Sequence, residues 1–228
     1  MIVRDGDEAA RPFAYFVIQK VACTSIKSAL APLFGIPSRA ATRERAGGEG
    51  PRFPIHRIFD RSGCQLSLSD FVRRAEAGDF RRHFAFAFVR NPYDRLVSCW
   101  SDKIAGGGEG LSDRDKELGL VRGLTFSWFV RVVSEIPDEE ANPHYRSQHL
   151  AICRADGTVV PEFLGSFENL AADFVHVCNE IGAPRLSLPH RLRSRGASKN
   201  YRDFYDGATR RIVERRFARD LELLGYRF

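Results

Sequence analysis

Two short apolar runs stand out along the chain, and a stretch with helical spacing follows each of them. Phe13–Gln19 and His83–Val89 are rich in aromatic and β-branched residues, which is typical of buried strands. Helices are predicted after them, over about Ser25–Leu33 and from Asn91 to about Ile104. Because strands alternate with helices, the pattern predicts an α/β fold with a central, mainly parallel sheet flanked by helices.

The helix after the second strand has the clearest start signal. Asn91 can accept a hydrogen bond from an N–H group of the first turn, and Pro92 has no N–H group to lose. At the end of the chain, apolar residues recur with helical spacing from Ile212 to Leu224, and Gly225 is a typical helix end. Helices are also predicted at Ser69–Ala77, Thr125–Ser134 and Glu168–Ile181, and a hairpin at Ala151–Phe163.

Residues 1–228 are predicted to form a single domain, since this length suits one domain with a sizeable core. Residues 38–54 and 106–119 lack periodicity and are predicted to be surface loops. Residues 1–11 are expected to be a flexible end. The two predicted loops therefore flank the segment that carries the second strand and its helix.

The composition adds an electrostatic constraint, because 35 Lys and Arg against 29 Asp and Glu give a net charge of +6. A basic surface attracts anions such as nucleic acid, acidic glycans, membranes or phosphorylated small molecules. Nucleic acid is not expected as a partner, since no base-stacking module or DNA-binding motif accompanies the charge. Peripheral contact of the basic surface with a membrane stays open, and the oligomeric state is not indicated.

The five cysteines include no close pair, which argues against a zinc ribbon or a dense disulfide framework and favours a reducing compartment. No stretch reaches the roughly 18 to 20 apolar residues of a membrane span. Residues 1–11 carry charges where a signal peptide is apolar. A cytoplasmic location is therefore expected, with a trimmed luminal domain as the alternative.

A first candidate site lies at Gln19–Lys27, where the first predicted strand gives way to a helix. Unpaired N–H groups and the helix dipole attract phosphate or sulfate at such a junction, and Lys20, Thr24 and Ser25 add donors. The segment is not a Walker A loop, because the glycines are missing and Lys20 precedes the turn, so a magnesium-dependent NTPase is disfavoured. An ordinary capped helix remains the alternative. The residues predicted to contact an anion are Lys20, Ala22, Cys23, Thr24, Ser25 and Ile26.

A second candidate site lies at Arg90–Ser98, at the end of the second predicted strand and in the helix that follows it. A guanidinium offers a planar fork to a phosphate, and a hydroxyl offers one donor. We therefore expect Arg90 and Ser98, two helical turns apart, to face one bound anion. Asp94 and Arg95 are expected to form an ion pair on the helix surface, with a contact to the ligand as the alternative.

Taken together, these segments resemble those of the PAPS-dependent sulfotransferases, in the carbohydrate sulfotransferase branch (PAPS is 3′-phosphoadenosine 5′-phosphosulfate). Lys20–Ser25 is similar to the 5′-phosphosulfate loop of that branch, and Arg90–Ser98 to its 3′-phosphate motif. The likeness covers about Phe13–Phe228. Further similar segments are Pro143–Gln148, Phe167–Leu170 and Tyr201–Phe228. Eukaryotic relatives carry a membrane anchor and luminal disulfides, neither of which is evident here, so compartment and acceptor are not carried over.

The resemblance implies a P-loop-like three-layer sandwich and an enzyme that moves the sulfuryl group of PAPS directly to a hydroxyl, most naturally of a carbohydrate. Lys20 then stabilises the leaving phosphate oxygen, and 3′,5′-ADP is the product. A sulfuryl group carries less negative charge than a phosphoryl group, so no metal is expected. Two alternatives stay open: another nucleotide-dependent transferase, such as a small-molecule kinase, and a non-catalytic binder of PAPS or sulfated glycans.

The base that removes the acceptor proton has three candidates. His56 is the leading one, because it lies between the two cofactor motifs and relatives often have a histidine in that interval. His144, in a Pro-His-Tyr context, is its rival, and Glu168 is a more distant third. His149 and Cys153 share helical spacing, but two residues do not complete a metal site.

A basic stretch near the end of the chain, His190–Tyr201, has two interpretations. It contains Arg193 and Lys199, and the resemblance implies that it covers the cofactor's 3′-phosphate or the acceptor. A solvated loop is the alternative.

Overall fold

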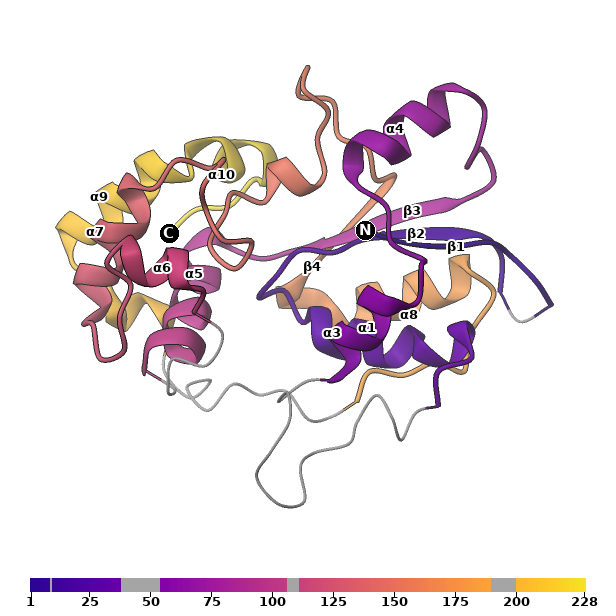
Figure 1. Cartoon of the computed structure of the whole chain (residues 1–228), viewed down its shortest axis with the longest axis horizontal. Helices are drawn as coiled ribbons and strands as arrows, with labels where there is room; N and C mark the ends of the chain where they lie inside the picture. The colour runs from indigo at the N-terminus through magenta and orange to yellow at the C-terminus, as the bar shows by residue number, and fades with distance from the viewer. Residues whose placement is uncertain (9, 38–53, 106–110, 190–199) are drawn as a thin grey trace. The chain divides into compact units, whose positions relative to one another are not determined.

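The computed structural model describes residues 1–8, 10–37, 54–105, 111–189 and 200–228 (Figure 1). The chain divides into two compact units. One, here called the sheet unit, comprises Met1–Val17, Ala22–Phe88 and Ala151–Leu192. The other, the helical unit, comprises Ile18–Val21, Val89–Leu150 and Arg193–Phe228. Compactness does not show that either unit folds alone, so the single domain stays a prediction.

The sheet unit is built on four strands in the order β1-β2-β3-β4. Strand β1 (Ile2–Arg4) pairs antiparallel with β2 (Phe13–Phe16), and β2 pairs parallel with β3 (Phe84–Val89), which neighbours β4 (Phe163–Ser166). All six residues of β3 are buried, as expected for a strand covered on both faces. The predicted α/β class with a mostly parallel sheet is confirmed.

Four helices cover this sheet: α1 (Cys23–Leu30), α3 (Pro54–Arg61), α4 (Leu68–Glu76) and α8 (Leu170–Glu180). Helices α1, α3 and α8 lie against one face, and α4 lies against the other (Figure 1). Aromatic residues contact both layers of helices. A single strand can reach both layers because its successive side chains point to opposite faces of the sheet. Phe13 meets Phe34, in the 3-10 turn Ala31–Phe34 that follows α1, at a ring distance of 5.9 Å, while Phe16 meets Phe71 of α4 at 5.3 Å.

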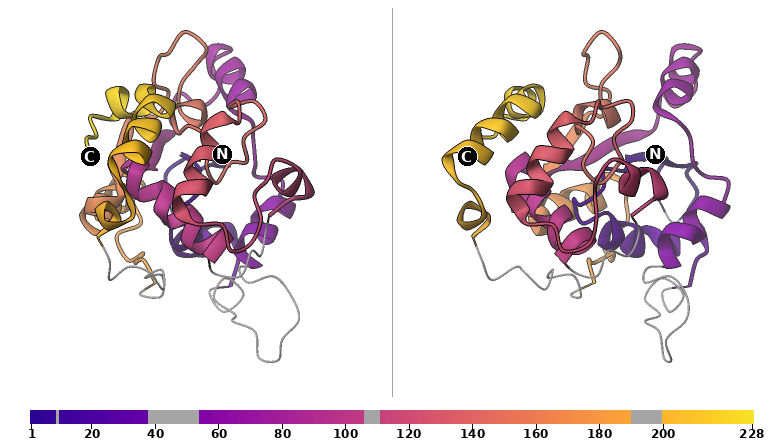
Figure 2. Two further views of the ribbon diagram at one scale, coloured as in Figure 1. Left: turned by 90° about the vertical axis from the view of Figure 1, so that its left-hand side faces the viewer. Right: turned by 60° about the vertical axis from the view of Figure 1, so that its left-hand side comes forward.

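The helical unit is built around α5 (Pro92–Trp100), which continues as a π-helical turn at Ser101–Ala105. Asn91 caps α5 by accepting a hydrogen bond from the N–H of Tyr93 at 3.0 Å, as predicted. The other helices are α6 (Asp113–Glu117), α7 (Phe126–Glu135), α9 (Gly207–Arg216) and α10 (Ala218–Leu224). Helices α7 and α9 pack side by side, and the yellow C-terminal helices can be followed in both views of Figure 2.

The core of the helical unit comes from aromatic and branched side chains of α5, α7 and α9 and the segments between them. Its members include Tyr93, Leu96, Phe129, Val133, Val213 and Phe217. Within the described ranges, no helix has both the length and the apolar character needed to cross a membrane.

Several boundaries differ from the prediction. The predicted loop 106–119 contains helix α6, which starts with a capping box formed by Ser112 and Asp115. Residues 1–11 include β1, whose pairing with β2 fixes part of the expected flexible end. Residues 38–53 and 106–110 lie outside the described residues.

Two further elements were only partly predicted. The expected hairpin is reduced to one antiparallel bridge between Cys153 and Val159, with Gly157 at φ 91°. The last predicted helix is two helices, because α9 ends at its C-cap Phe217 and α10 begins there. Gly225 ends α10 in the left-handed conformation, as predicted.

Candidate active site

The turn between β2 and α1 has an unusual backbone. Lys20 and Ala22 have φ values of 68° and 53°, in the left-handed region that non-glycine residues rarely adopt. Each such residue costs of order 1–3 kcal/mol, and such strain is concentrated at functional sites. Left-handed residues also occur in backbone nests, in which successive N–H groups form a concave site that binds anions.

Helix α1 begins directly after this turn. Ala22 is its N-cap, and among the described residues no side chain caps the helix. Uncapped N–H groups at the helix start favour a bound anion. Thr24 and Ser25 lie in this first turn, where their hydroxyls add donors.

A chain of polar contacts joins α1 to α3. Thr24 Oγ1 lies 3.0 Å from His56 Nε2, and Lys27 Nζ lies 3.3 Å from His56 Nδ1. Because an ammonium has only donors, Lys27 donates to Nδ1, and the neutral ring then donates from Nε2 to the Thr24 hydroxyl. The hydroxyl keeps its own hydrogen for another acceptor. Burial lowers the pKa of Lys27.

Lys20 is held in the helical unit by the π-helical turn. Its Nζ lies 3.1 Å from Asp102 Oδ2, and Lys103 Nζ lies 3.8 Å from the same oxygen. π-Helical insertions are rare and are frequent at functional sites. Here the turn places one carboxylate between two lysines, which gives the cluster a net positive charge.

Arg90 is buried and its guanidinium is anchored on two sides. Nε donates to Asp94 at 2.8 Å, and Nη1 donates to the main-chain carbonyl of Lys20 at 3.1 Å. Its own main-chain N–H and carbonyl are both bound by the Gln148 side chain, at 3.0 and 2.8 Å. The fully buried carboxylate of Asp220 in turn accepts from the Gln148 N–H at 2.6 Å. Helix α10 therefore helps to fix the position of Arg90.

Arg95 does not form the expected surface pair with Asp94, which pairs with Arg90 instead. Arg95 is only 3% exposed and donates to three main-chain carbonyls. These belong to Gln19 at 2.9 Å, Arg146 at 2.8 Å and Pro143 at 3.0 Å. Arg95 thus ties the turn before Lys20 and the segment around His144 to helix α5.

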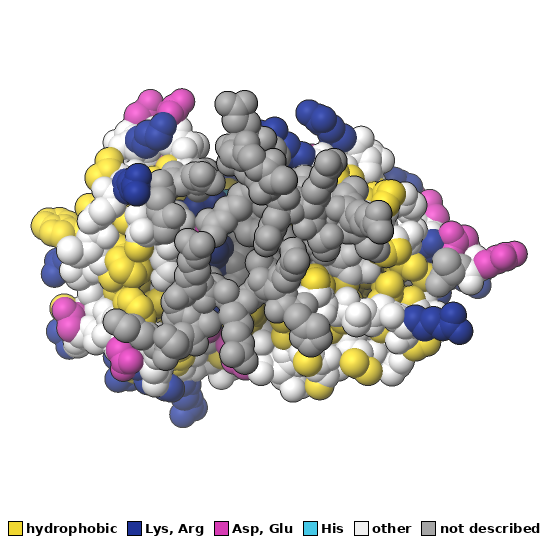
Figure 3. All heavy atoms as spheres, turned by 90° about the horizontal axis from the view of Figure 1, so that it is seen from below, with side chains coloured by type: hydrophobic (Ala, Val, Ile, Leu, Met, Phe, Trp, Pro, Cys, Tyr) yellow, Lys and Arg dark blue, Asp and Glu magenta, His cyan; other side chains and the backbone are white. Residues whose placement is uncertain are grey.

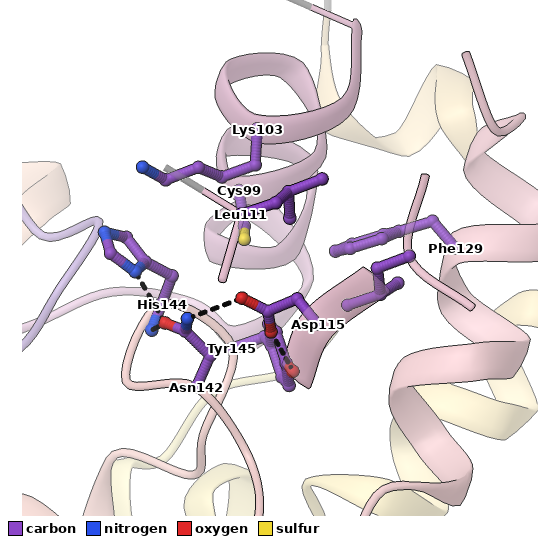
Figure 4. Close-up of a pocket in the computed structure, with 9 residues that line it drawn as sticks. Cys99, Lys103, Leu111, Asp115, Phe129, Asn142, His144 and Tyr145 are labelled. Atoms are coloured by element: carbon purple, nitrogen blue, oxygen red, sulfur yellow. Dashed lines mark hydrogen bonds between the residues drawn. The ribbon is translucent and has the colours of Figure 1, made fainter. Parts of the chain in front are cut away.

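His144 lines a pocket of the helical unit together with Cys99, Lys103, Asp115, Asn142 and Tyr145 (Figure 4). Its Nδ1 lies 2.7 Å from Asn142 Oδ1. Burial and the nearby charges of Lys103, Lys20 and Arg95 lower the pKa of His144 to about 3. The imidazole is therefore neutral at physiological pH.

These features can be set beside known proteins. Residues 8–227 match the sulfotransferase family. The chain belongs to the sulfotransferase family. Curated proteins similar to it are carbohydrate sulfotransferase 14 of Danio rerio, Mus musculus and Homo sapiens, at 25%, 26% and 25% identity over 187 residues. These matches cover 76%, 75% and 75% of this chain but 47%, 45% and 45% of the relatives, so the chain spans about half their length. No solved structure matches. The predicted relation to the carbohydrate branch is confirmed.

For this sulfotransferase-family chain, the structure locates most of the predicted site residues. Thr24 and His56 meet in the sheet unit, while Lys20, Arg90 and His144 belong to the helical unit. Ser98, Cys23 and Ile26 are buried, and Glu168 is exposed. Arg193 and Lys199 lie outside the described residues. The roles of all of these residues stay predictions.

Sequence reasoning missed Asp102, Asn142 and Asp115, and it gave no role to Lys27, the last residue of the first candidate segment. Asp115 ends an S-x-x-D capping signature that begins at Ser112, but no motif marked Asp102 or Asn142. His149 contacts Asp220, with 2.7 Å between Nδ1 and Oδ1. In the described part of the chain no three His, Cys, Asp or Glu residues are grouped to hold a metal, and metal independence stays a prediction.

Proposed function

We propose that this chain is a sulfotransferase that moves the sulfuryl group of PAPS to a hydroxyl of a carbohydrate by direct in-line transfer. Membership of the family and the carbohydrate sulfotransferases among its relatives support this proposal. The observation that carries it is the β2–α1 turn, where two left-handed residues precede a helix start with no side-chain cap among the described residues. Such a turn suits a doubly charged anion such as a phosphosulfate.

The 5′-phosphosulfate is assigned to this turn and to the start of α1. Main-chain N–H groups and the hydroxyls of Thr24 and Ser25 donate to its oxygens. The Lys20 ammonium neutralises the charge that grows on the leaving phosphate oxygen as the S–O bond breaks. Asp102, 3.1 Å from Lys20, restrains that side chain before the donor binds.

The 3′-phosphate is assigned to Arg90 and Ser98, with Arg193 and Lys199 as further predicted contacts. The guanidinium is buried, so a phosphate contact there is little screened by solvent. Asp94 holds the guanidinium and Gln148 holds the Arg90 main chain before binding, which lowers the entropy lost when a ligand binds.

The finer architecture belongs to the same proposal. We infer a P-loop-like three-layer sandwich, supported by helices on both faces of the sheet in the sheet unit (Figure 1). We also propose transfer without a metal ion. On the face drawn in Figure 3, Lys and Arg side chains are dispersed among Asp and Glu. We propose that nucleic acid is not a partner, and peripheral contact of the basic surface with a membrane stays open.

Calorimetry with 3′,5′-ADP, 5′-AMP and ATP, each with and without a chelator, tests the donor assignment. Tight binding of 3′,5′-ADP that is indifferent to the chelator, with weaker binding of the other two, is expected. Equal affinity for ATP, or loss of binding with the chelator, would favour a kinase-like transferase. Sulfur-labelled PAPS incubated with a panel of desulfated glycosaminoglycans and neutral glycans then tests transfer. Donor binding without any labelled glycan would indicate a non-catalytic binder.

A further inference from the structure

The orientation of Asn142 fixes the proton on His144. The main-chain N–H of His144 donates to Asn142 Oδ1 at 3.1 Å, so that atom is the amide oxygen. The same oxygen lies 2.7 Å from His144 Nδ1, which must therefore carry a hydrogen. Asn142 Nδ2 donates in the other direction, to Asp115 Oδ2 at 2.9 Å. The neutral ring is thus held with its proton on Nδ1 and a lone pair on Nε2.

Asp115 anchors this chain of hydrogen bonds. The residue is only 2% exposed, and its carboxylate accepts from the Tyr145 hydroxyl at 2.7 Å and from the Ser112 hydroxyl and N–H at 2.7 and 2.8 Å. Burial opposes its ionisation, but the hydrogen bonds from Tyr145, Ser112 and Asn142 keep the pKa of Asp115 below its ordinary value. An ionised carboxylate has only acceptors, so the amide cannot be turned round without losing a bond.

His144 Nε2 lies on the opposite side of the ring from Asn142, as Figure 4 shows. The charged groups that act on the ring are Lys103, Asp102 and Arg95 from α5 and its π-helical turn, and Lys20 from the preceding turn. Cys99 of α5 and Tyr145 line the same pocket. Burial raises the pKa of the Cys99 thiol to about 11, and burial and the Asp115 hydrogen bond raise that of Tyr145. Neither group competes for a proton near neutral pH.

We propose that His144 Nε2 accepts the proton of the acceptor hydroxyl during sulfuryl transfer, with Asn142 and Asp115 as positioning residues that fix its tautomer. The inference rests on the proposed function. In the step, the hydroxyl oxygen bonds to sulfur, its proton moves to Nε2, and the S–O bond to the 5′-phosphate breaks with its electron pair left on the phosphate oxygen. The products are a sulfate ester, 3′,5′-ADP and an imidazolium.

The surrounding charges make this base depend on the donor. Three cations and one carboxylate act on the ring, so an imidazolium is disfavoured in the empty site. The negative charges of a donor bound at Lys20 offset those cations, and the imidazole then holds a proton more readily. His56 differs, since both of its ring nitrogens contact Thr24 or Lys27. In this assignment His56 orients the Thr24 hydroxyl.

Nitrogen NMR on the wild-type protein tests the tautomer without any substrate. We expect His144 to carry its proton on Nδ1, whereas in Asn142→Ala the Nε2-protonated form should become substantial. Titration with 3′,5′-ADP below pH 6 should then protonate the ring, with net proton uptake measured by calorimetry in two buffers. Uptake should be absent in His144→Gln, and His176→Gln, an exposed histidine of α8, is the matched control.

Transfer assays with labelled PAPS and the best glycan of the panel complete the test. Turnover of His144→Gln should fall by about a hundredfold or more, with 3′,5′-ADP affinity retained. Free imidazole should partly restore His144→Gly, which loss of packing alone would not allow. Near-normal turnover of His144→Gln, an Nε2-protonated wild-type ring, or binding of 3′,5′-ADP without proton uptake would each overturn the assignment. Failure of the wild-type protein to bind 3′,5′-ADP would instead remove the proposed function on which it rests.

Discussion

Replacing Arg90 by alanine should selectively weaken binding of ligands that carry a 3′-phosphate. In the wild-type protein this buried guanidinium is held by Asp94 at 2.8 Å and by the Lys20 carbonyl at 3.1 Å. A charge-assisted hydrogen bond in such a site contributes about 1.5–3 kcal/mol. Loss of one or two phosphate contacts should therefore cost about 2–4 kcal/mol, or roughly 30- to 700-fold in dissociation constant.

The effect of the substitution can be separated from damage to the site. Alanine also leaves Asp94 without its 2.8 Å partner, so some loss of thermal stability is expected for every ligand state. Calorimetry should therefore compare 3′,5′-ADP with 5′-AMP, which lacks only the 3′-phosphate. The loss should be confined to 3′,5′-ADP. Arg90→Lys keeps the charge without the planar fork, so its affinity for 3′,5′-ADP should lie between those of the wild type and Arg90→Ala. Arg11→Ala, which replaces an exposed arginine, is the control.

Two outcomes would refute this reasoning. Unchanged affinity for 3′,5′-ADP in a folded Arg90→Ala protein would show that Arg90 does not bind the 3′-phosphate. An equal loss of affinity for both nucleotides would indicate that Arg90 acts through the backbone of Lys20, to which it is also bonded.

Three further predictions concern neighbouring groups. Lys20→Ala should lower the turnover of labelled PAPS by at least tenfold with little change in 3′,5′-ADP affinity, since charge on the leaving oxygen grows only in the transition state. Equal losses of turnover and affinity would show that Lys20 binds the donor in the ground state instead. His56→Ala should weaken donor binding through Thr24 while its pH–rate profile keeps the wild-type acidic limb, and loss of that limb would make His56 the base. The pKa of Asp115 is lowered in the folded protein, so it adds stability above about pH 3.9, the ordinary value, and that stability is lost as pH falls further. Urea unfolding from pH 6 to 2.5 should show this loss in the wild type and a smaller one in Asp115→Asn.

The local parts of the fold could be predicted because local physics determines them. Asn91 and Pro92 define the start of α5, and Gly225 ends α10 in the left-handed conformation. Helix α6 was missed because five residues are too few to show a period, although Ser112 and Asp115 form its capping box.

The site could be predicted in its residue types but not in its pairing. Asp94 lies next to Arg95 and four residues after Arg90, and only the buried packing of α5 decides that Arg90 is its partner. The contact between Thr24 and His56 depends on two helices separated by residues for which no pattern was visible. The left-handed backbone of Lys20 and Ala22 could not be predicted either, since such strain is imposed by tertiary structure.

The contacts of Arg95 bear on how this chain can change over generations. Its guanidinium donates to the main-chain carbonyls of Gln19, Pro143 and Arg146, and every amino acid offers a carbonyl in that place. Side chains at these three positions can therefore be exchanged without removing the bonds that hold both segments on α5. A mutation of Arg95 itself removes all three bonds at once. Variation in the side chains of Gln19, Pro143 and Arg146 is thus compatible with a constant backbone frame on both sides of the site, as far as these three bonds set it.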